Sequence, residues 1–250
     1  MGAVLSPLLF PAPPRHLSGG LRQSNDVIWI ETATGGKTPA VYIRKPGTRF
    51  TLLYTHGNAE DLGQMLPELP LTADACGASV FAVEYPGYSI SEAPQPSEQL
   101  CYEAVEAAYA HIINVLQIPA ERVIPFGRSL GSGPAVHLAS LHPEIRGLIL
   151  QSPLESGARA VLNPVVGYVG YMVDPFKNYR KIEDVEATTC IMHGEADEVV
   201  PCHNGKGLFN ALERRGKAAT PLWLKGRGHN DMPVDAVMRH ARDFLNSLPA

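Results

Sequence analysis

The sequence has few charged residues, few cysteines and no long apolar run. Charged residues make up 18% of the 250 residues, with 21 lysines and arginines against 25 aspartates and glutamates. The net charge of −4 and the lack of a basic tract argue against nucleic-acid binding, because a phosphate backbone attracts positive charge. No stretch reaches the ~18 apolar residues of a membrane span. The most apolar stretch, residues 160–173, is broken by glycine, asparagine and proline.

The four cysteines form neither a CxxC pair nor a set with metal-ligand spacing, and they are Cys76, Cys101, Cys190 and Cys202. We therefore expect free, mostly buried thiols in a reducing compartment. Residues 1–16 lack the basic segment of a signal peptide, and four prolines interrupt their apolar run. These features predict a cytoplasmic protein.

After a Pro-rich lead, residues 1–20, short apolar runs alternate with helical stretches. Residues 26–31 and 40–44 predict an antiparallel pair joined by a turn at 34–39, and the later runs predict buried parallel strands. The expected later strands are residues 50–55, 79–83, 122–126, 147–152, 188–193 and 220–224. The clearest expected helices are one at 98–116 after the N-cap Ser97 and one at 234–248. The alternation predicts a single α/β domain over residues 21–250, with a mostly parallel central sheet flanked by helices.

Functional residues in such a sheet gather at the carboxyl ends of the strands. Gly127-Arg-Ser-Leu-Gly131 follows a predicted strand and precedes a helical run at 135–140. A G-x-S-x-G motif in this context is typical of a nucleophile elbow, in which a strained turn raises the serine above the sheet. Ser129 is therefore the candidate nucleophile, although the pentapeptide alone also fits an ordinary glycine-rich turn.

A serine hydroxyl needs a base that is oriented by a carboxylate, and in this arrangement the chain order is serine, acid, histidine. His229 lies in a glycine-rich loop at 225–230, directly after the last predicted strand, where a loop can carry an imidazole over the sheet. It is the candidate base. The other histidines after Ser129 fit the order poorly, and they are His137, His142, His193, His203 and His240.

The acid is expected in the loop after the strand that ends at residue 193, where the sequence supplies three carboxylates. Asp197 lies at the tip of this loop, and it is the candidate. Glu195 and Glu198 are expected to be solvated loop charges. Asp174 is the competitor from outside the loop.

An oxyanion hole needs two backbone N–H groups, one after the nucleophile and one from the loop after an earlier strand. Leu130 supplies the first. Gly57 permits a sharp turn at the end of the strand at 50–55, which aims the N–H of Asn58 inward. The alternative is a simple strand-ending turn in which His56 is a structural hydrogen-bonder.

Six motifs in this order together resemble the α/β-hydrolase superfamily, and they are Tyr54-Thr-His-Gly-Asn-Ala-Glu-Asp-Leu62, Tyr85-Pro-Gly-Tyr88, Gly127-Arg-Ser-Leu-Gly131, Gln151-Ser-Pro-Leu154, His193-Gly-Glu-Ala-Asp-Glu198 and Gly228-His-Asn-Asp231. Within the superfamily, the sequence is most similar to the seventeenth numbered branch of the α/β-hydrolase-domain proteins, serine hydrolases known as protein depalmitoylases. The resemblance runs from about Phe10 to the final helix. It implies the α/β-hydrolase fold, with Ser129, Asp197 and His229 as a catalytic triad.

Two features depart from that branch. Its animal members carry a cysteine-rich, palmitoylated N-terminus that anchors them to membranes, whereas no cysteine precedes Cys76 here. Pro125 stands inside the strand before the elbow, where it removes a ladder N–H. One N-terminal feature could replace the anchor, because Met1-Gly-Ala-Val-Leu-Ser6 fits the myristoylation pattern. A chance match is the alternative reading of this pattern.

Residues 155–187 stand where larger relatives place a lid, so we expect a small cap region there. Its segments 160–162 and 165–173 are apolar enough to wall an acyl-chain groove or to touch a bilayer. A helix packed on the sheet is the alternative for these segments.

The predicted activity is hydrolysis of esters or thioesters through an acyl-enzyme, without a metal or organic cofactor. The expected substrate carries a medium or long acyl chain, which an acylated protein would supply, and peripheral membrane contact is a second expectation. A short-chain carboxylesterase and a peptidase are the enzyme alternatives. The alternative of another class is a non-catalytic scaffold that binds apolar ligands. The ordered set of Ser129, Asp197 and His229 argues against the scaffold.

Overall fold

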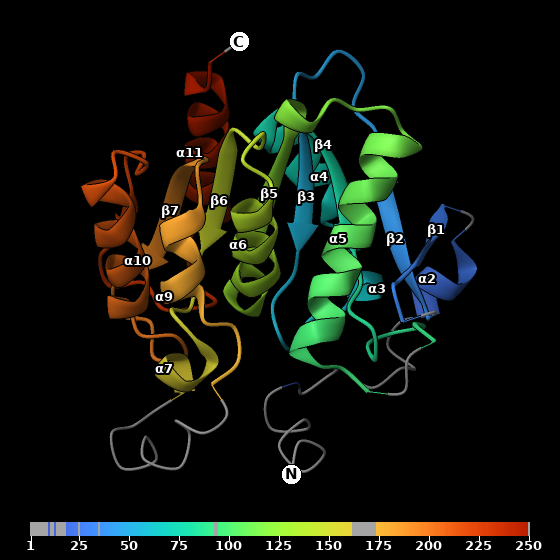
Figure 1. The fold of residues 1–250 in the computed structure, drawn as a ribbon, viewed down its shortest axis with the longest axis horizontal. Coiled ribbons are helices and arrows are strands. Elements are labelled where there is room, and N and C mark those ends of the chain that lie inside the picture. Colours follow the sequence, from blue (N-terminus) through green and yellow to red (C-terminus); the bar gives the residue numbers. More distant parts are fainter. Residues whose placement is uncertain are drawn as a thin grey trace.

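The computed structural model describes residues 10, 13, 19–24, 26–34, 36–92, 95–161 and 174–249. These residues form one sheet of eight strands in the order β1-β2-β4-β3-β5-β6-β7-β8 (Figure 1). The strands are β1 (Val27–Glu31), β2 (Lys37–Ile43), β3 (Thr51–Thr55), β4 (Ser79–Val83), β5 (Val123–Arg128), β6 (Gly147–Gln151), β7 (Thr188–Gly194) and β8 (Leu222–Leu224). β2 is antiparallel to both neighbours and the other neighbouring pairs are parallel, which confirms the predicted mostly parallel sheet.

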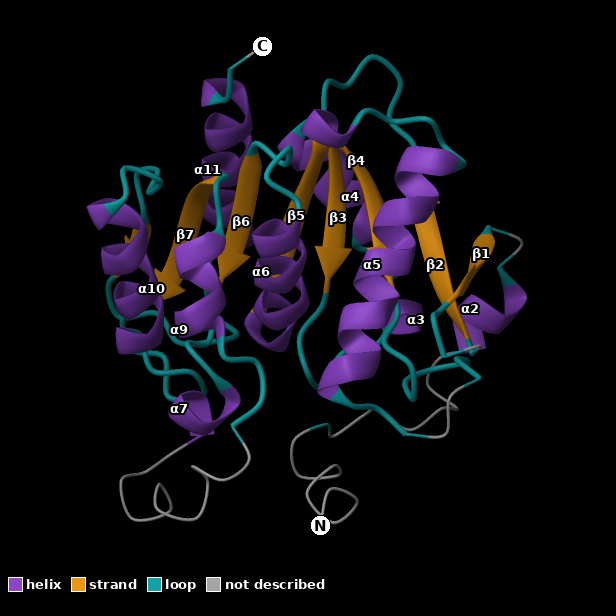
Figure 2. Ribbon diagram, in the orientation of Figure 1, coloured by secondary structure: helices purple, strands orange, loops and turns teal. Residues whose placement is uncertain are grey.

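Helices cover both faces of the sheet (Figure 2). One face packs against α2 (Gly19–Gln23), α3 (Leu62–Met65), α4 (Leu69–Cys76) and α11 (Val234–Ser247). The other packs against α5 (Glu98–Asn114), α6 (Ser132–Leu141) and α10 (His203–Arg214), and α9 (Asn178–Lys181) lies on this side against α6. α7 (Gly157–Val161) lies at the edge toward which the parallel strands point (Figure 1). Short 3-10 turns occur at Ala120–Arg122, Ser129–Gly131 and Ile182–Asp184.

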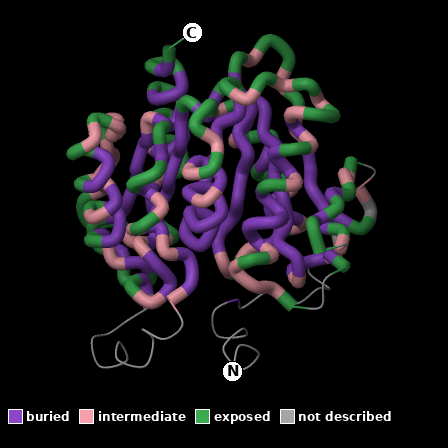
Figure 3. Tube along the Cα trace, viewed as in Figure 1, coloured by how far each residue is buried: buried purple, intermediate pink, exposed green. Residues whose placement is uncertain are grey.

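Burial on both faces explains why the parallel strands are continuously apolar (Figure 3). All five residues of β4 are buried, and their side chains alternate between the two cores. Val80 and Ala82 belong to the core under α4 and α11, and Phe81 belongs to the core under α5 and α6. Both faces of the sheet are therefore covered, and its carboxyl edge is the place where loops can carry function.

The element boundaries follow the sequence closely, with one error in the first hairpin. The predicted turn at 34–39 is too long, because β2 already begins at Lys37. Pro39 pairs with Trp29 of β1, and its carbonyl oxygen accepts the N–H of Glu84 at 2.9 Å. A proline fits there because it contributes to the ladder as an acceptor. The N-cap of α5 is confirmed, since the Ser97 hydroxyl accepts the N–H of Leu100 at 3.2 Å.

Pro125 is accommodated in β5 by the register of the two neighbouring ladders. It pairs with Leu53 of β3 on one side. On the other side the ladder to β6 begins only at Phe126, which pairs with Ile149. The missing N–H thus falls before the β5–β6 ladder starts, and the strand remains regular up to the motif that follows it.

The predicted cap, residues 155–187, is described only in part, because residues 162–173 fall outside the described residues. α7 lies at the carboxyl edge of the sheet, as a cap would. Residues 178–187 instead join the core of a sheet face, where Ile182, Val185 and Ala187 are buried. Gly2 and its myristoylation pattern also lie outside the described residues. Within the residues that the structure describes, no helix is long and apolar enough to cross a membrane.

Candidate active site

Ser129 stands on a strained turn between β5 and α6. Its φ is +53°, a left-handed conformation that residues other than glycine seldom adopt. The flanking glycines let the chain pack closely around it. A Cβ on Gly127 would lie 2.5 Å from the carbonyl oxygen of Gly131, and a Cβ on Gly131 would collide with the carbonyl oxygen of Thr55. The turn therefore has the geometry of a nucleophile elbow.

His229 and Asp197 complete a hydrogen-bonded row with this serine. Nε2 of His229 lies 3.0 Å from Ser129 Oγ, and its Nδ1 lies 2.7 Å from Asp197 Oδ2. Because an ionised carboxylate can only accept, Nδ1 carries the proton and Nε2 presents its lone pair to the hydroxyl. The three residues come from loops after β8, β7 and β5, which the parallel strands bring to one edge of the sheet.

Both carboxylate oxygens of Asp197 are held in place. Oδ1 accepts the N–H groups of Val199 and Val200 at 2.9 and 2.8 Å, while Oδ2 faces His229. Burial by itself raises the pKa of this carboxyl. The hydrogen bonds from His193, His229 and the Val200 N–H outweigh that effect and leave the pKa of Asp197 well below its usual range. The carboxylate therefore stays ionised opposite the imidazole.

His193 supports the acid loop, a role that the sequence analysis did not assign to it. Its Nε2 donates to the carbonyl oxygen of Val200 at 2.8 Å and lies 3.2 Å from Asp197 Oδ2. The ring is fully buried against Gly205 of α10. His193 thus fixes the turn that presents Asp197. The sequence feature that could have indicated this role is the i, i+4 spacing of the two residues across a tight turn.

The competing carboxylates lie outside the row. Glu195 forms an ion pair with Lys206 at 3.2 Å, and Glu198 is exposed. Asp174 Oδ1 accepts the N–H of Ala158 at 3.0 Å, at the start of α7. Asp197 is therefore the carboxylate that the structure brings to His229.

The turn after β3 is organised by a buried histidine. His56 Nε2 lies 2.7 Å from Glu84 Oε1, and its Nδ1 lies 2.8 Å from the carbonyl oxygen of Gly57. Glu84 also accepts the N–H of Leu62 at 2.8 Å, so one carboxylate ties β4 to the turn and to the start of α3. His56 is a structural hydrogen-bonder, and its partner Glu84 carried no signal in the sequence.

Asn58 and Leu130, the residues predicted to supply the oxyanion N–H groups, both border the cavity beside Ser129. The side-chain oxygen of Asn58 accepts the Tyr88 hydroxyl at 2.7 Å. This hydrogen bond ties the turn after β3 to the loop after β4 beside the cavity.

Arg128 connects the three loops of the site. It forms an ion pair with Glu60, whose other carboxylate oxygen accepts the N–H of Gly57 at 2.7 Å. Its second nitrogen donates to the side-chain oxygen of Asn230 at 2.9 Å. One guanidinium thus links the residue before Ser129 to the turn after β3 and to the loop of the histidine.

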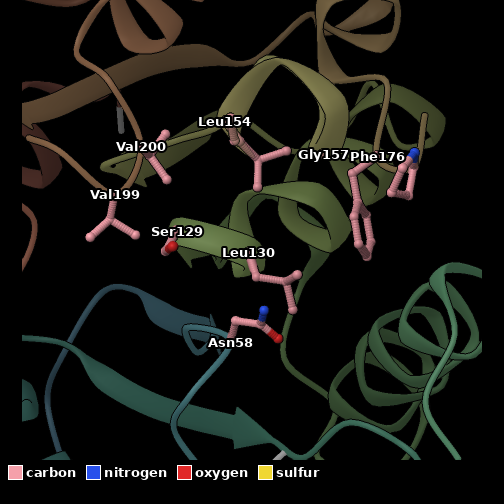
Figure 4. A pocket seen from close by; sticks show the side chains of 10 residues that line it. Asn58, Ser129, Leu130, Leu154, Gly157, Phe176, Val199 and Val200 are labelled. Carbon is pink, nitrogen blue, oxygen red and sulfur yellow. The ribbon is translucent and has the colours of Figure 1, made fainter. Parts of the chain in front are cut away.

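A cavity of about 120 Å³ opens beside the serine (Figure 4). Its wall is apolar apart from Asn58 and Ser129, and the other lining residues are Leu130, Leu154, Gly157, Ala160, Pro175, Phe176, Val199 and Val200. Val199 and Val200 come two and three residues after Asp197, so the acid loop also forms part of the wall. Within the described parts of the chain, no group of three or more His, Cys, Asp or Glu residues is placed to hold a metal ion.

A mostly parallel sheet with a strained serine turn after β5, and with an acid and a histidine after β7 and β8, defines the α/β-hydrolase class. A family model described as alpha/beta hydrolase fold matches residues 51–188, and one described as prolyl oligopeptidase family matches residues 153–246. Solved structures agree with the fold. An esterase of Pyrococcus furiosus has a TM-score of 0.66 at 16% identity, covering 94% of each chain. Est1E of Butyrivibrio proteoclasticus has a TM-score of 0.71 at 15% identity, covering 88% of this chain and 98% of its own.

Curated relatives are more specific. Alpha/beta hydrolase domain-containing protein 17C of Xenopus laevis is 36% identical over 223 residues, which cover 88% of this chain and 70% of the relative. The protein of the same name from Homo sapiens is 34% identical, with 88% and 66% covered. The chain therefore belongs to the family of α/β-hydrolase domain-containing protein 17, a branch of the hydrolase superfamily.

Proposed function

We propose that this protein is a serine hydrolase that cleaves acyl esters or thioesters through an acyl-enzyme. The observation that carries the proposal is the row from Ser129 Oγ through His229 to Asp197, which stands beside an apolar cavity. A nucleophile, a base and an orienting carboxylate at these distances have the arrangement that acyl transfer requires. The protein would reach acylated proteins in the cytoplasm or by peripheral contact with a membrane.

The chemistry follows from the direction of the hydrogen bonds. Nε2 of His229 takes the proton of Ser129 as Oγ attacks the acyl carbonyl carbon. Asp197 stabilises the imidazolium that forms, because its carboxylate stays ionised at the protonated Nδ1. The imidazolium then gives its proton to the leaving oxygen or sulfur, and the acyl group remains on Oγ. A water molecule, deprotonated by the same nitrogen, hydrolyses the acyl-enzyme and restores the serine.

The developing negative charge on the carbonyl oxygen needs donors that are already in place. We assign this role to the backbone N–H groups of Leu130 and Asn58, which flank Ser129 at the cavity. The buried pair of His56 and Glu84 holds the turn that carries Asn58. Preorganised donors of this kind typically contribute ~10²–10³ in turnover.

The wall of the cavity favours an acyl group over a polar one. Leu154, Phe176, Val199 and Val200 would remove the first methylenes of an acyl chain from water at about 0.8 kcal/mol each. The names of the curated relatives state no substrate, so the acyl group is assigned from the cavity alone.

The test is a series of acyl esters and acyl thioesters with chains of two to sixteen carbons, hydrolysed by the wild type and by Ser129→Ala. We expect activity that depends on Ser129 and rises with chain length over at least the first several carbons. Activity confined to the shortest esters would make this a general carboxylesterase. No activity at any length would favour a non-catalytic scaffold.

A peptidase is the second candidate, because the prolyl oligopeptidase model matches residues 153–246, which include Asp197 and His229. Hydrolysis of peptide amides that carry apolar residues before the scissile bond, compared with hydrolysis of the matched esters, distinguishes a peptidase from an esterase. The ester proposal predicts that esters exceed the matched amides in kcat/KM by several orders of magnitude, and comparable values would favour the peptidase.

A further inference from the structure

A second hydrogen-bonded row, on elements that the candidate active site does not use, ends in a lysine. Nζ of Lys181, the last residue of α9, lies 2.9 Å from Nδ1 of His137 on α6. Nε2 of the same imidazole lies 2.6 Å from Oε1 of Glu106 on α5. The order carboxylate, imidazole, nucleophile is the same as in Asp197, His229 and Ser129. Here, however, Nε2 faces the carboxylate and Nδ1 faces the nucleophile.

The direction of the hydrogen bonds is set by the carboxylate. Glu106 can only accept when it is ionised, so His137 carries its proton on Nε2 and turns the lone pair of Nδ1 toward the amine. Burial is the main cause that lowers the pKa of His137, which keeps the ring neutral and able to accept a proton. The neutral imidazole of His137 is therefore positioned to accept a proton from the amine.

The surroundings of Lys181 favour a reactive amine. Burial lowers the pKa of Lys181 to about 8, against the opposing effects of Glu98 and Glu106. Its Nζ lies 3.6 Å from the ring centroid of Tyr102, which is itself stacked on His137. This ring face attracts the ammonium form, so it acts with the two carboxylates against the effect of burial. The Tyr102 hydroxyl donates to Glu98 at 2.6 Å, so that carboxylate is engaged elsewhere.

The row remains open to solvent. Lys181 is half-buried, the side chain of His137 is 14% exposed and that of Glu106 is 45% exposed. A small electrophile can therefore approach the amine, whereas a fully enclosed lysine would be protected.

We propose that Lys181 is a reactive lysine, activated by His137 and Glu106, which is acylated by small acyl thioesters. In the step, Nζ attacks the thioester carbonyl carbon and forms a C–N bond, while His137 Nδ1 takes the amine proton. The C–S bond breaks, the sulfur leaves as a thiolate and accepts that proton, and the products are an amide and a thiol. This reaction needs none of Ser129, His229 and Asp197. Its test is therefore independent of the proposed hydrolase activity.

The test uses the full chain with Ser129→Ala, which removes hydrolysis of the reagent as a competing reaction. Folded protein is incubated briefly with acetyl-coenzyme A between pH 7 and pH 10, and acetylation of each lysine is followed by peptide mass spectrometry. Lys225, an exposed loop lysine, is the internal control. We expect Lys181 to react at least about fivefold faster than Lys225 at pH 8, with a midpoint near the lowered pKa of this amine.

Two variants separate activation from accessibility. His137→Phe keeps a ring on Tyr102 but removes the base, and it should bring the rate of Lys181 down to that of Lys225 or below. Glu106→Gln keeps the shape and removes the charge, and it should give an intermediate rate. If the melting temperature shows that His137→Phe is unfolded, Glu106→Gln becomes the deciding variant, because the side chain of Glu106 is 45% exposed and its replacement disturbs the core less. Lys181 no faster than Lys225, or a rate that is unchanged in the folded variants, would overturn the proposal.

Discussion

Backbone strain gathers beside the candidate active site at the scale of single residues. Ser129 has a φ of +53°, and Ser89, Ser152 and Phe176 also have positive φ values, whereas Gln117, the remaining such non-glycine residue among those described, lies after α5. The two other serines follow β4 and β6 at the same edge of the sheet, and Phe176 lines the cavity. Such conformations persist only where the surrounding structure enforces them, and they concentrate at functional sites. The G-x-S-x-G motif predicts the first of these positions, whereas the others have no comparable signal.

Replacing Asp197 by asparagine tests the electrostatics of the row. The neutral amide cannot hold the imidazole in the same tautomer or stabilise its cation, so we expect Asp197→Asn to lower kcat by about 10³–10⁴-fold with little change in KM. Steady-state kinetics on a medium-chain thioester measure this. A loss of less than tenfold would show that another group orients His229.

The same carboxylate makes stability depend on pH in a predictable direction. Its pKa in the folded protein lies below the value of about 3.9 that an unfolded chain shows. A depressed pKa stabilises the fold above that unfolded value, and the contribution is lost as pH falls toward the folded pKa. Urea denaturation between about pH 7 and pH 2 should therefore show a steeper loss for the wild type than for Asp197→Asn, with the difference arising below about pH 4. Parallel curves would contradict the assignment.

Elements with a strong period or a continuous apolar run were the most predictable from sequence. The strand at 79–83 and the N-cap Ser97 match the structure, because burial on both faces and a capped amphipathic helix leave clear patterns. The start of β2 was wrong, since Pro39 reads as a turn residue until its acceptor contacts are known. α9 was not predicted, because a helix of four residues shows no period.

The serine turn packs so closely against the end of β3 that position 131 has no room for a side chain. A methyl group on Gly131 would meet the carbonyl oxygens of Thr55 and His56, which are backbone atoms and cannot swing aside. We expect Gly131→Ala to lower the free energy of unfolding by about 3 kcal/mol. Gly36→Ala is the matched control, since its nearest contact is an ordinary 3.8 Å from the Thr32 hydroxyl. Equal stability of the two variants in urea denaturation would show that the crossing relaxes easily.

The whole molecule assembles its candidate site from loops that are far apart in sequence. The order of Ser129, Asp197 and His229 along the chain predicts which residues meet, because the carboxyl ends of parallel strands converge. The supporting contacts are less visible. These contacts are the hydrogen bond of Glu84 to His56 and the links of Arg128 to Glu60 and Asn230. They join side chains of different loops, and no rule of sequence spacing predicts them.

The measurement that tests the central claim most directly is labelling of the folded protein with a fluorophosphonate, read by intact mass and by the modified peptide. The account predicts one phosphonyl group on Ser129, none in Ser129→Ala, and labelling at least about 10²-fold slower in His229→Ala, which loses the base. No adduct on the folded wild type, or an adduct on a residue other than Ser129, would contradict the account.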